Sequence, residues 1–330
     1  MESKCKISII IPMYNAEKYI DNCLGSITSS DLQQGEYEIV VVDDGSIDNG
    51  AKIVEKYVCK HPFIHYLKQE NQGQSTARNY GIRVANGEYI WCVDADDSIE
   101  KAANNILLTL KKHPEIDILA IQLKKVSEQG EDLGKECVQP LVTHQKIISG
   151  KEAMIEGYLP SSVCALIIKK TLFFDNNIFF TPGITHQDVE LTYRLMPFAS
   201  KVLFSDDTPY RYIHHDNSTS KSLKPEKKIK YMLDEIVIVK SFIASAKKYS
   251  STDPLLSKTI NKRVYDVLFG LVLSLFRNRK LYNKIGVNKI VIDKLTQEGL
   301  YPLKGSNYSF KKKILIHGIL NFRFLLTRKY

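Results

Sequence analysis

The first hundred residues alternate between short apolar runs and longer stretches with helical periodicity. The apolar runs are rich in β-branched residues, which is typical of strands buried on both faces of a parallel sheet. The strands predicted in this way cover residues 7–11, 38–42, 63–68 and 88–93. The helices predicted between them cover residues 17–29, 48–61 and 75–85, the last with Ser75 as its N-cap.

This alternation predicts the fold class. Strands and helices in this order imply an α/β protein with a doubly wound, mostly parallel sheet, right-handed crossovers and flanking helices. In such sheets, ligands bind at the carboxyl ends of the strands, near the point where the strand order reverses. Three strand ends, at 12–15, 43–46 and 94–97, carry polar or acidic residues. We therefore expect these residues to meet at one edge of the sheet.

The pattern changes beyond residue 100. A helix and a strand are predicted within 104–121 and another strand within 161–169, whereas 122–150 is polar and expected to vary in conformation. Long helical periodicity begins after Pro225 and predicts a helical C-terminal region. The predicted domains are an α/β domain over 1–220 and a helical region with a basic amphipathic tail over 221–330.

The composition is that of an ordinary globular protein, with 44% apolar and 25% charged residues. The start of the chain does not resemble a signal peptide, and the longest later apolar stretch, 264–276, is too short to span a bilayer. The six cysteines are scattered and form no Cys-x-x-Cys pair, which is typical of reduced, mostly buried thiols. These features predict a cytoplasmic protein.

The net charge of +9 is concentrated at the end of the chain. Residues 301–330 contain seven Lys or Arg and no acidic residue, so the first 300 residues are nearly neutral. This distribution, without a basic-aromatic recognition module, weighs against a protein that uses the tail to bind nucleic acid. Basic residues flank apolar ones in the tail, as in Lys311–Lys313 before Ile314–Ile316. Two structures remain open: an interfacial helix on anionic lipid at the cytoplasmic face of a membrane, or a packed terminal helix with a solvated basic face.

Three carboxylates lie within four residues at Asp94-Ala95-Asp96-Asp97. Two carboxylates about 5 Å apart repel by roughly 3 kcal/mol at an effective dielectric constant of about 20. A divalent cation removes this repulsion, and oxygen ligands favour Mg²⁺ or Mn²⁺. The motif predicts a site for such a cation and for phosphate oxygens, with Asp96 as the first ligand and Asp94 and Asp97 beside it. The alternative is an acidic turn that caps a helix after Ser98.

Further polar groups follow the other strands. A carboxylate of Asp43 or Asp44 can accept the imide N–H of uracil, and Tyr14 can stack on the base; a β-turn and simple packing are the alternatives. Residues 69–81 lead into the third predicted helix, whose N-terminus favours phosphate. In that helix, Arg78 is expected either to contact a bound nucleotide or to form an ion pair with the aspartates. The chain has no Gly-x-Gly-x-x-Gly and no P-loop motif, which argues against a dinucleotide oxidoreductase and a P-loop enzyme.

Taken together, these motifs resemble family 2 glycosyltransferases of the GT-A fold. The motifs in question are SIIIPMYN at 8–15, VDDGSID at 42–48, NQGQSTARNYG at 71–81 and DADD at 94–97. The resemblance implies inverting transfer of a sugar from a nucleotide-diphospho-sugar, usually a UDP-sugar, to an acceptor hydroxyl. The residues implied in nucleotide-sugar binding are Pro12, Tyr14, Asp43, Asp44, Asn71, Gly73, Arg78, Asp94, Ala95 and Asp96.

The resemblance extends to a second acidic segment, around Asp188. Family members often have Glu-Asp here, followed at three-residue intervals by a bulky apolar residue and an arginine, and Asp188, Leu191 and Arg194 match that pattern. Asp188 is thereby implied as the base that takes the proton from the acceptor hydroxyl. Gln187 replaces the usual Glu, which keeps open a catalytically silent member that binds nucleotide sugar. Glu190 is a competing base, but on a helix it points away from Asp188 and is expected at the surface.

Residues 210–220 resemble the family's tyrosine-containing segment, which closes the catalytic domain and often contacts donor or acceptor. His214 and His215 lie in this segment and have the chemistry of metal or phosphate ligands. Paired histidines in a polar loop are more often exposed, and we expect them to be exposed here. The predicted acceptor is a glycan or a lipid-linked glycan, as in the assembly of surface polysaccharide or glycolipid, and membrane contact of the tail would suit it.

Overall fold

The computed structural model of the chain describes residues 5–136, 146–159, 162–215, 224–304 and 308–328. The chain divides into two compact units. The first comprises Met1–Gly183 and Gln187–His215, and the second comprises Ile184–His186 and Asp216–Tyr330. The domain boundary predicted at residue 220 lies outside the described residues.

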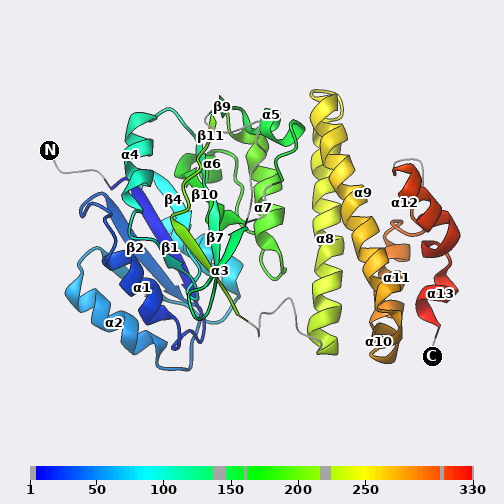
Figure 1. Cartoon of the computed structure of the whole chain (residues 1–330), viewed down its shortest axis with the longest axis horizontal. Helices are drawn as coiled ribbons and strands as arrows, with labels where there is room; N and C mark the ends of the chain where they lie inside the picture. The colour runs from blue at the N-terminus through cyan, green and yellow to red at the C-terminus, as the bar shows by residue number, and fades with distance from the viewer. Residues whose placement is uncertain (1–4, 137–145, 160–161, 216–223, 305–307, 329–330) are drawn as a thin grey trace. The chain divides into compact units, whose positions relative to one another are not determined.

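The core of the first unit is an eight-stranded sheet (Figure 1). In spatial order its strands are β3 (Ile64–Lys68), β2 (Tyr37–Asp43), β1 (Ile7–Met13), β4 (Tyr89–Cys92), β10 (Leu166–Lys169), β6 (Ile118–Ala120), β11 (Val202–Phe204) and β9 (Ile147–Ile148). From β3 to β4 the strands are parallel, and β11 is parallel to β6. β10 is antiparallel to β4 and β6, and β9 is antiparallel to β11. β1, β2 and β4 are buried along their whole length, as their apolar runs predicted, and the α/β fold is confirmed.

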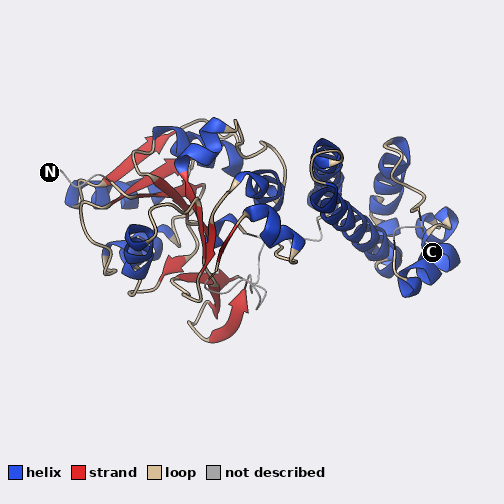
Figure 2. Cartoon of the chain, turned by 90° about the horizontal axis from the view of Figure 1, so that it is seen from above, coloured by secondary structure: helices blue, strands red, loops and turns tan. Residues whose placement is uncertain are grey.

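Helices cover both faces of this sheet (Figure 2). They are α1 (Ile20–Thr28), α2 (Gly50–Lys60), α3 (Gln74–Val84), α4 (Asn104–Lys112), α5 (Gly150–Ile155), α6 (Lys170–Asp175) and α7 (Gln187–Leu195), with short 3₁₀ segments at Val163–Ala165 and Met196–Phe198. α3 approaches β1 so closely that a Cβ atom on Gly81 would lie 2.5 Å from Cγ2 of Ile10. The N-cap of α3 is Gly73, so the prediction of Ser75 was wrong; Ser75 is buried in the first turn.

A smaller sheet has the strand order β5 (Ser98–Ile99), β12 (Tyr210–His214), β7 (Leu123–Ser127) and β8 (Asp132–Glu136). β7, β8 and β9 lie in the segment 122–150, for which no regular structure was predicted, because partly exposed polar strands leave no apolar run. The strand predicted over 161–169 begins only at Leu166, and residue 161 lies outside the described residues. β5 starts at Ser98, so the helix that the acidic-turn alternative requires there is not formed.

The second unit is helical. Its elements are α8 (Pro225–Tyr249), α9 (Pro254–Arg277), α10 (Arg279–Lys284), α11 (Val287–Gln297), α12 (Phe310–Leu315), a π-helical segment (Ile316–Leu320) and α13 (Arg323–Thr327). Pro225 and Pro254 occupy the first turns of α8 and α9, where the missing N–H has no intrahelical partner to lose. The Asp253 side chain accepts a hydrogen bond from the Leu256 N–H and caps α9. Among the described residues, no helix is both long and apolar enough to cross a membrane.

Glu235 is a partly buried carboxyl group on α8. Burial raises its pKa to about 7, although Lys228 and Arg263 oppose the shift. Because this pKa exceeds the value of 4.5 for an unperturbed glutamate, the folded state holds a proton that the unfolded chain releases between those values. Stability therefore falls as the pH rises through this range. We expect Glu235→Gln to raise the free energy of unfolding by up to about 3 kcal/mol at pH 8. At pH 4, where Glu235 is protonated in both states, we expect no change.

Urea titrations at the two pH values, followed by the helical circular dichroism signal, measure this effect. Glu226→Gln, at an exposed position in the first turn of the same helix, is the control. An equal effect of Glu235→Gln at pH 4 and pH 8 would contradict the titration.

Candidate active site

Arg78 on α3 is the central residue of the site. Its side chain is 1% exposed, and its guanidinium donates to two carboxylates. Nη2 lies 2.6 Å from Oδ1 of Asp94, which follows β4, and Nη1 lies 2.7 Å from Oδ1 of Asp188, in the first turn of α7. Of the two roles considered for Arg78, the ion pair with the aspartates is present. One buried cation thus joins two acidic motifs that are far apart in the sequence.

Asp188 uses its two oxygens differently. Oδ1 accepts the short hydrogen bond from Arg78, whereas Oδ2 has a long contact of 3.4 Å with the Val163 N–H. The side chain is 20% exposed. Burial raises the pKa of Asp188, although the charge of Arg78 opposes this shift. A carboxylate with a raised pKa and a weakly bonded oxygen has the properties of a general base.

The acidic motif forms a compact group of oxygens. One carboxylate oxygen from each of Asp94, Asp96 and Asp97 lies within 4.8 Å of the others. The Asp96 side chain is 50% exposed. Asp97 is buried, and its two oxygens accept hydrogen bonds from the Tyr210 hydroxyl at 2.5 Å and the Ile213 N–H at 2.8 Å. Asp97 therefore ties the motif to β12, while Asp96 is the more accessible oxygen ligand.

The acidic residues also repel one another. Burial and the charge of Asp94 raise the pKa of Asp96, and burial with both neighbouring charges raises the pKa of Asp97. A divalent cation bound to these oxygens would relieve the repulsion. The donor set is made of carboxylate oxygens, the ligands that Mg²⁺ and Mn²⁺ favour, so the residues present fit such an ion.

His215 lies beside the acidic motif. Its Nε2 is 3.9 Å from Oδ2 of Asp96, its Nδ1 is 2.6 Å from Oε1 of Glu128, and its ring centroid is 4.8 Å from that of Tyr19. The side chain is 13% exposed, so the prediction that this histidine is exposed was wrong. A carboxylate that orients the far nitrogen of an imidazole is a common arrangement around metal ligands. Of the segment 210–220, residues 216–220 lie outside the described residues.

A chain of amides ends on Asp94. Gln187 donates through Nε2 to Oε1 of Gln74 at 2.6 Å, and Gln74 donates through Nε2 to Oδ1 of Asp94 at 3.1 Å. The residue that departs from the family's usual Glu is therefore connected to the acidic motif. Nothing in the sequence indicated a role for Gln74, because its partners come from other elements.

Glu190 is buried, at 3% exposure, so its predicted surface position was wrong. Its carboxylate forms an ion pair with Arg194, with Nε 2.6 Å from Oε1, and accepts a hydrogen bond from the Thr181 hydroxyl at 2.9 Å. Arg194 also donates to the Phe179 carbonyl at 2.6 Å. These contacts hold α7 against the preceding loop and leave Asp188 as the base candidate on this helix.

Asp43 and Asp44 are both buried at the end of β2. Asp43 accepts hydrogen bonds from the Ser46 N–H at 2.8 Å and the Tyr66 hydroxyl at 2.6 Å. Asp44 accepts from three groups of the loop before α3: the Gln69 side chain at 2.7 Å, the Gln72 N–H at 2.9 Å and the Gly73 N–H at 2.8 Å. The Asp43 side chain thus bridges to Ser46 after the strand, and Asp44 holds the loop at the sheet edge.

The same edge presents two exposed apolar side chains, Tyr14 at 53% and Ile47 at 90% exposure. Asn15 connects the two loops through two hydrogen bonds: its N–H donates to the Ser46 hydroxyl at 3.0 Å, and its side chain accepts from the Ile47 N–H at 3.0 Å.

The remaining predicted donor-site residues lie in the neighbouring segments: Pro12 buried in β1, Asn71 donating to the Asp44 carbonyl at 3.0 Å, Gly73 capping α3, and Ala95 buried within the acidic motif.

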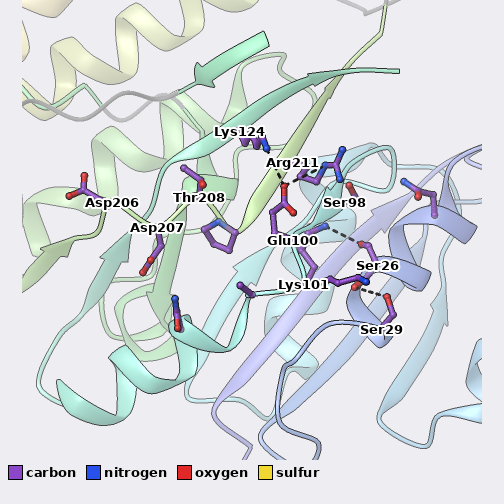
Figure 3. A pocket seen from close by; sticks show the side chains of 15 residues that line it. Ser26, Ser29, Ser98, Glu100, Lys101, Lys124, Asp206, Asp207, Thr208 and Arg211 are labelled. Carbon is purple, nitrogen blue, oxygen red and sulfur yellow. Dashed lines mark hydrogen bonds and ion pairs between the residues drawn. The ribbon is translucent and has the colours of Figure 1, made fainter. Parts of the chain in front are cut away.

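A separate pocket lies on the other side of β12 (Figure 3). Glu100 stands in it between Lys124 and Arg211, 3.8 Å from a nitrogen of each. Successive residues of a strand point to opposite faces, so Tyr210 reaches Asp97 while Arg211 lines this pocket. The pocket therefore does not contain the acidic motif.

The fold and the acidic edge define an α/β protein with a cluster of carboxylates beside the end of a central parallel strand, and comparisons with known proteins identify its family. The family model for glycosyl transferase family 2 matches residues 8–155. Glycosyltransferase GlyG of Streptococcus pneumoniae is 31% identical over 226 residues, which cover 64% of this chain and 72% of that protein. The chain belongs to glycosyl transferase family 2.

Two further likenesses bear on length and fold. The uncharacterized glycosyltransferase YibD of Escherichia coli is 28% identical over 67% of this chain, and the match spans 65% of YibD, just under two thirds of its length. The crystal structure of Staphylococcus aureus TarS 1–349 in complex with UDP-GlcNAc superposes with a TM-score of 0.67 at 22% identity, covering 98% of this chain and 93% of that one. This likeness shows that the chain has the GT-A fold.

Proposed function

We propose that the chain is an inverting glycosyltransferase that moves a sugar from a nucleotide-diphospho-sugar, in the first place a UDP-sugar, to an acceptor hydroxyl. The observation that carries the proposal is the double ion pair of Arg78, which sets the base candidate Asp188 beside the acidic motif. The complex of TarS with UDP-GlcNAc supports the donor class.

In the proposed reaction, Asp188 accepts the proton of the acceptor hydroxyl through its weakly bonded Oδ2 as that hydroxyl attacks the anomeric carbon. The attack comes from the face opposite the leaving diphosphate, so the configuration is inverted. Arg78 orients Asp188 through Oδ1 and leaves Oδ2 with the long contact to the Val163 N–H.

Asp96 and Asp94 are the residues proposed to hold a Mn²⁺ or Mg²⁺ ion, with His215 beside them and Asp97 as a further oxygen ligand. When bound, the metal supplies positive charge that offsets the charge developing on the leaving diphosphate. Asp43 or Asp44 is proposed to accept the imide N–H of the base, since each carboxylate oxygen has more than one lone pair. Tyr14 and Ile47 offer apolar surface against the base.

Replacing Asp96 by asparagine tests the proposal most directly. We expect release of nucleoside diphosphate, measured over a panel of UDP-sugars with Mn²⁺ and an acceptor extract, to fall by about 10²- to 10³-fold. EDTA should abolish the same release from the unchanged protein. Glu55→Gln, at an exposed position on α2, is the matched loss of one carboxylate and should leave the rate unchanged.

The absence of turnover with every donor and acceptor extract, together with unchanged donor binding in Asp96→Asn, would contradict the enzyme proposal. Full activity in EDTA would contradict the metal assignment alone and would remove the metal from the mechanism.

The alternative is a catalytically silent member that binds nucleotide sugar without transferring it. The observation that favours it is Gln187, an amide where family members often have a carboxylate, held by Gln74. The Gln187→Glu variant separates the two proposals. Transfer that appears only in this variant would establish the silent protein, whereas transfer by the unchanged chain would exclude it.

The acceptor is proposed to be a glycan or a lipid-linked glycan used in assembly of surface polysaccharide or glycolipid, with the protein at the cytoplasmic face of the membrane. The basic C-terminal tail supports this placement. Transfer of labelled sugar into the lipid fraction of a membrane extract tests the acceptor class. Label confined to water-soluble glycan would exclude a lipid-linked acceptor.

A further inference from the structure

The helices α12 and α13 each pack on the protein through one face and expose apolar residues on another. In α12, Phe310 and Ile314 are four residues apart and share one face, where they are 78% and 58% exposed. Lys312 lies on the other face. Its ammonium pairs with Asp266 of α9 at 2.6 Å and stands 4.9 Å from the Phe269 ring centroid. α12 thus packs on α9 through its lysine and presents its apolar residues outward.

α13 likewise packs on the protein and exposes apolar residues. Leu326 is fully buried, and its carbonyl accepts a hydrogen bond of 2.6 Å from the Asn288 side chain on α11. Phe324, two residues earlier, is 61% exposed, and Phe322 is 47% exposed. Figure 1 shows α12 and α13 beside α9 and α11 at the end of the helical unit. Both terminal helices therefore pack inward and expose aromatic residues.

The exposed apolar residues are concentrated in this short segment. Of the nineteen large hydrophobic side chains that are exposed among the described residues, five lie between 310 and 324. They are Phe310, Ile314, Leu315, Phe322 and Phe324. Five exposed apolar residues within fifteen positions, on helices packed against the same unit, are a candidate contact surface, whereas single ones are common on any protein. We call these five residues the terminal apolar face.

The charge around this face has one sign. Lys311 and Lys313 flank Ile314 in α12, and within the described part of the chain neither forms a salt bridge. Lys312 and Arg323 are neutralised by Asp266 and Asp293, so the neutralised basic residues differ from Lys311 and Lys313. No acidic residue occurs after residue 300. The surface combines exposed aromatic and aliphatic residues with unneutralised lysines.

We propose that the terminal apolar face docks on the surface of an anionic lipid bilayer, with its aromatic residues in the headgroup region and Lys311 and Lys313 against lipid phosphates. This combination of side chains is that of an interfacial helix, whose binding adds buried apolar area to attraction by anionic lipid. The two structures that the sequence left open for the tail are therefore combined: it packs on the protein and has a second face for lipid.

Sedimentation of the full chain with vesicles tests this proposal. We expect binding to vesicles of equal parts phosphatidylglycerol and phosphatidylcholine, little binding to phosphatidylcholine alone, and weakening by salt. Phe310→Ser with Ile314→Ser should weaken binding to the mixed vesicles by at least about tenfold, because two apolar side chains that the bilayer would bury are lost. Lys311→Ala with Lys313→Ala should weaken it by about 30-fold and reduce its salt dependence. Leu255→Ser, at an exposed apolar position of α9 in the same unit, is the control and should bind as the unchanged chain does.

Three results would overturn the proposal. The first is equal binding of the unchanged chain and both double variants. The second is equal binding to neutral and anionic vesicles. The third is the absence of vesicle binding together with self-association that Phe310→Ser and Ile314→Ser abolish, which would make the face an interface between copies of the chain. The measurement needs no donor or acceptor, so its failure is distinct from failure of the proposed sugar transfer.

Discussion

In the Asp188→Asn variant, kcat of sugar transfer is expected to fall by about 10²- to 10⁴-fold. Asparagine keeps a side-chain oxygen that can accept the hydrogen bond from Arg78, but its amide cannot take a proton from the acceptor hydroxyl. Arg78 also keeps its pairing with Asp94, so the donor end of the site should be unchanged. The rate is measured as nucleoside diphosphate release in the presence of acceptor, and donor affinity by calorimetry.

Unchanged donor affinity is the second half of this expectation. Loss of donor binding in Asp188→Asn would contradict the assignment of Asp188 as base, because it would place this carboxylate on the donor. Glu55→Gln again controls for the loss of one negative charge.

The Arg78→Met variant is expected to have a free energy of unfolding about 3–5 kcal/mol lower than that of the unchanged chain. Methionine fills much of the space of the buried arginine but leaves Asp94 and Asp188 without their shared cation. Unfolding of the first unit can be followed through Trp91, the single tryptophan, which is fully buried in β4. A urea titration monitored by its fluorescence measures the change.

A matched arginine lies on the same helix. Arg83 is exposed and stands 4.8 Å over the Phe179 ring, so Arg83→Met should cost no more than about 1 kcal/mol. Adding Asp188→Asn to Arg78→Met removes one of the two stranded charges and should restore part of the stability. Equal costs at Arg78 and Arg83, or no restoration in the double variant, would show that the buried ion pairs do not stabilise the fold.

The sequence was sufficient for the parallel part of the fold. β1, β2 and β4 are buried on both faces, and this burial requires the continuous apolar runs from which they were predicted. The polar strands β7 and β8 pair with each other, and they were missed because partly exposed polar strands leave no apolar run. A local sequence pattern predicts a strand well only where the whole strand has the same environment, as in a strand buried on both faces.

The same limit applies to the site. The acidic motif and Asp188 could be named from motifs, but Glu190 and His215 were placed wrongly. Glu190 is buried because a second surface, around Thr181 and Phe179, covers its side of α7, and a helical wheel drawn from Asp188 cannot show this. His215 is oriented by Glu128, a residue 87 positions earlier in the chain. Contacts of this kind depend on the assembled fold.

The hydrogen bonds from the loop before α3 to Asp44 affect the free energy of ligand binding. A loop that becomes ordered only when a ligand arrives subtracts about 0.5–1.5 kcal/mol from the affinity for each long side chain that it immobilises. Here one carboxylate already holds two consecutive backbone N–H groups, and the Asn71 side chain bonds back to the Asp44 carbonyl. The conformational entropy of this segment is therefore lost when the chain folds, and its loss does not reduce the free energy of binding of the proposed nucleotide sugar. Donor association should consequently proceed without a slow loop-closing phase at this edge of the sheet.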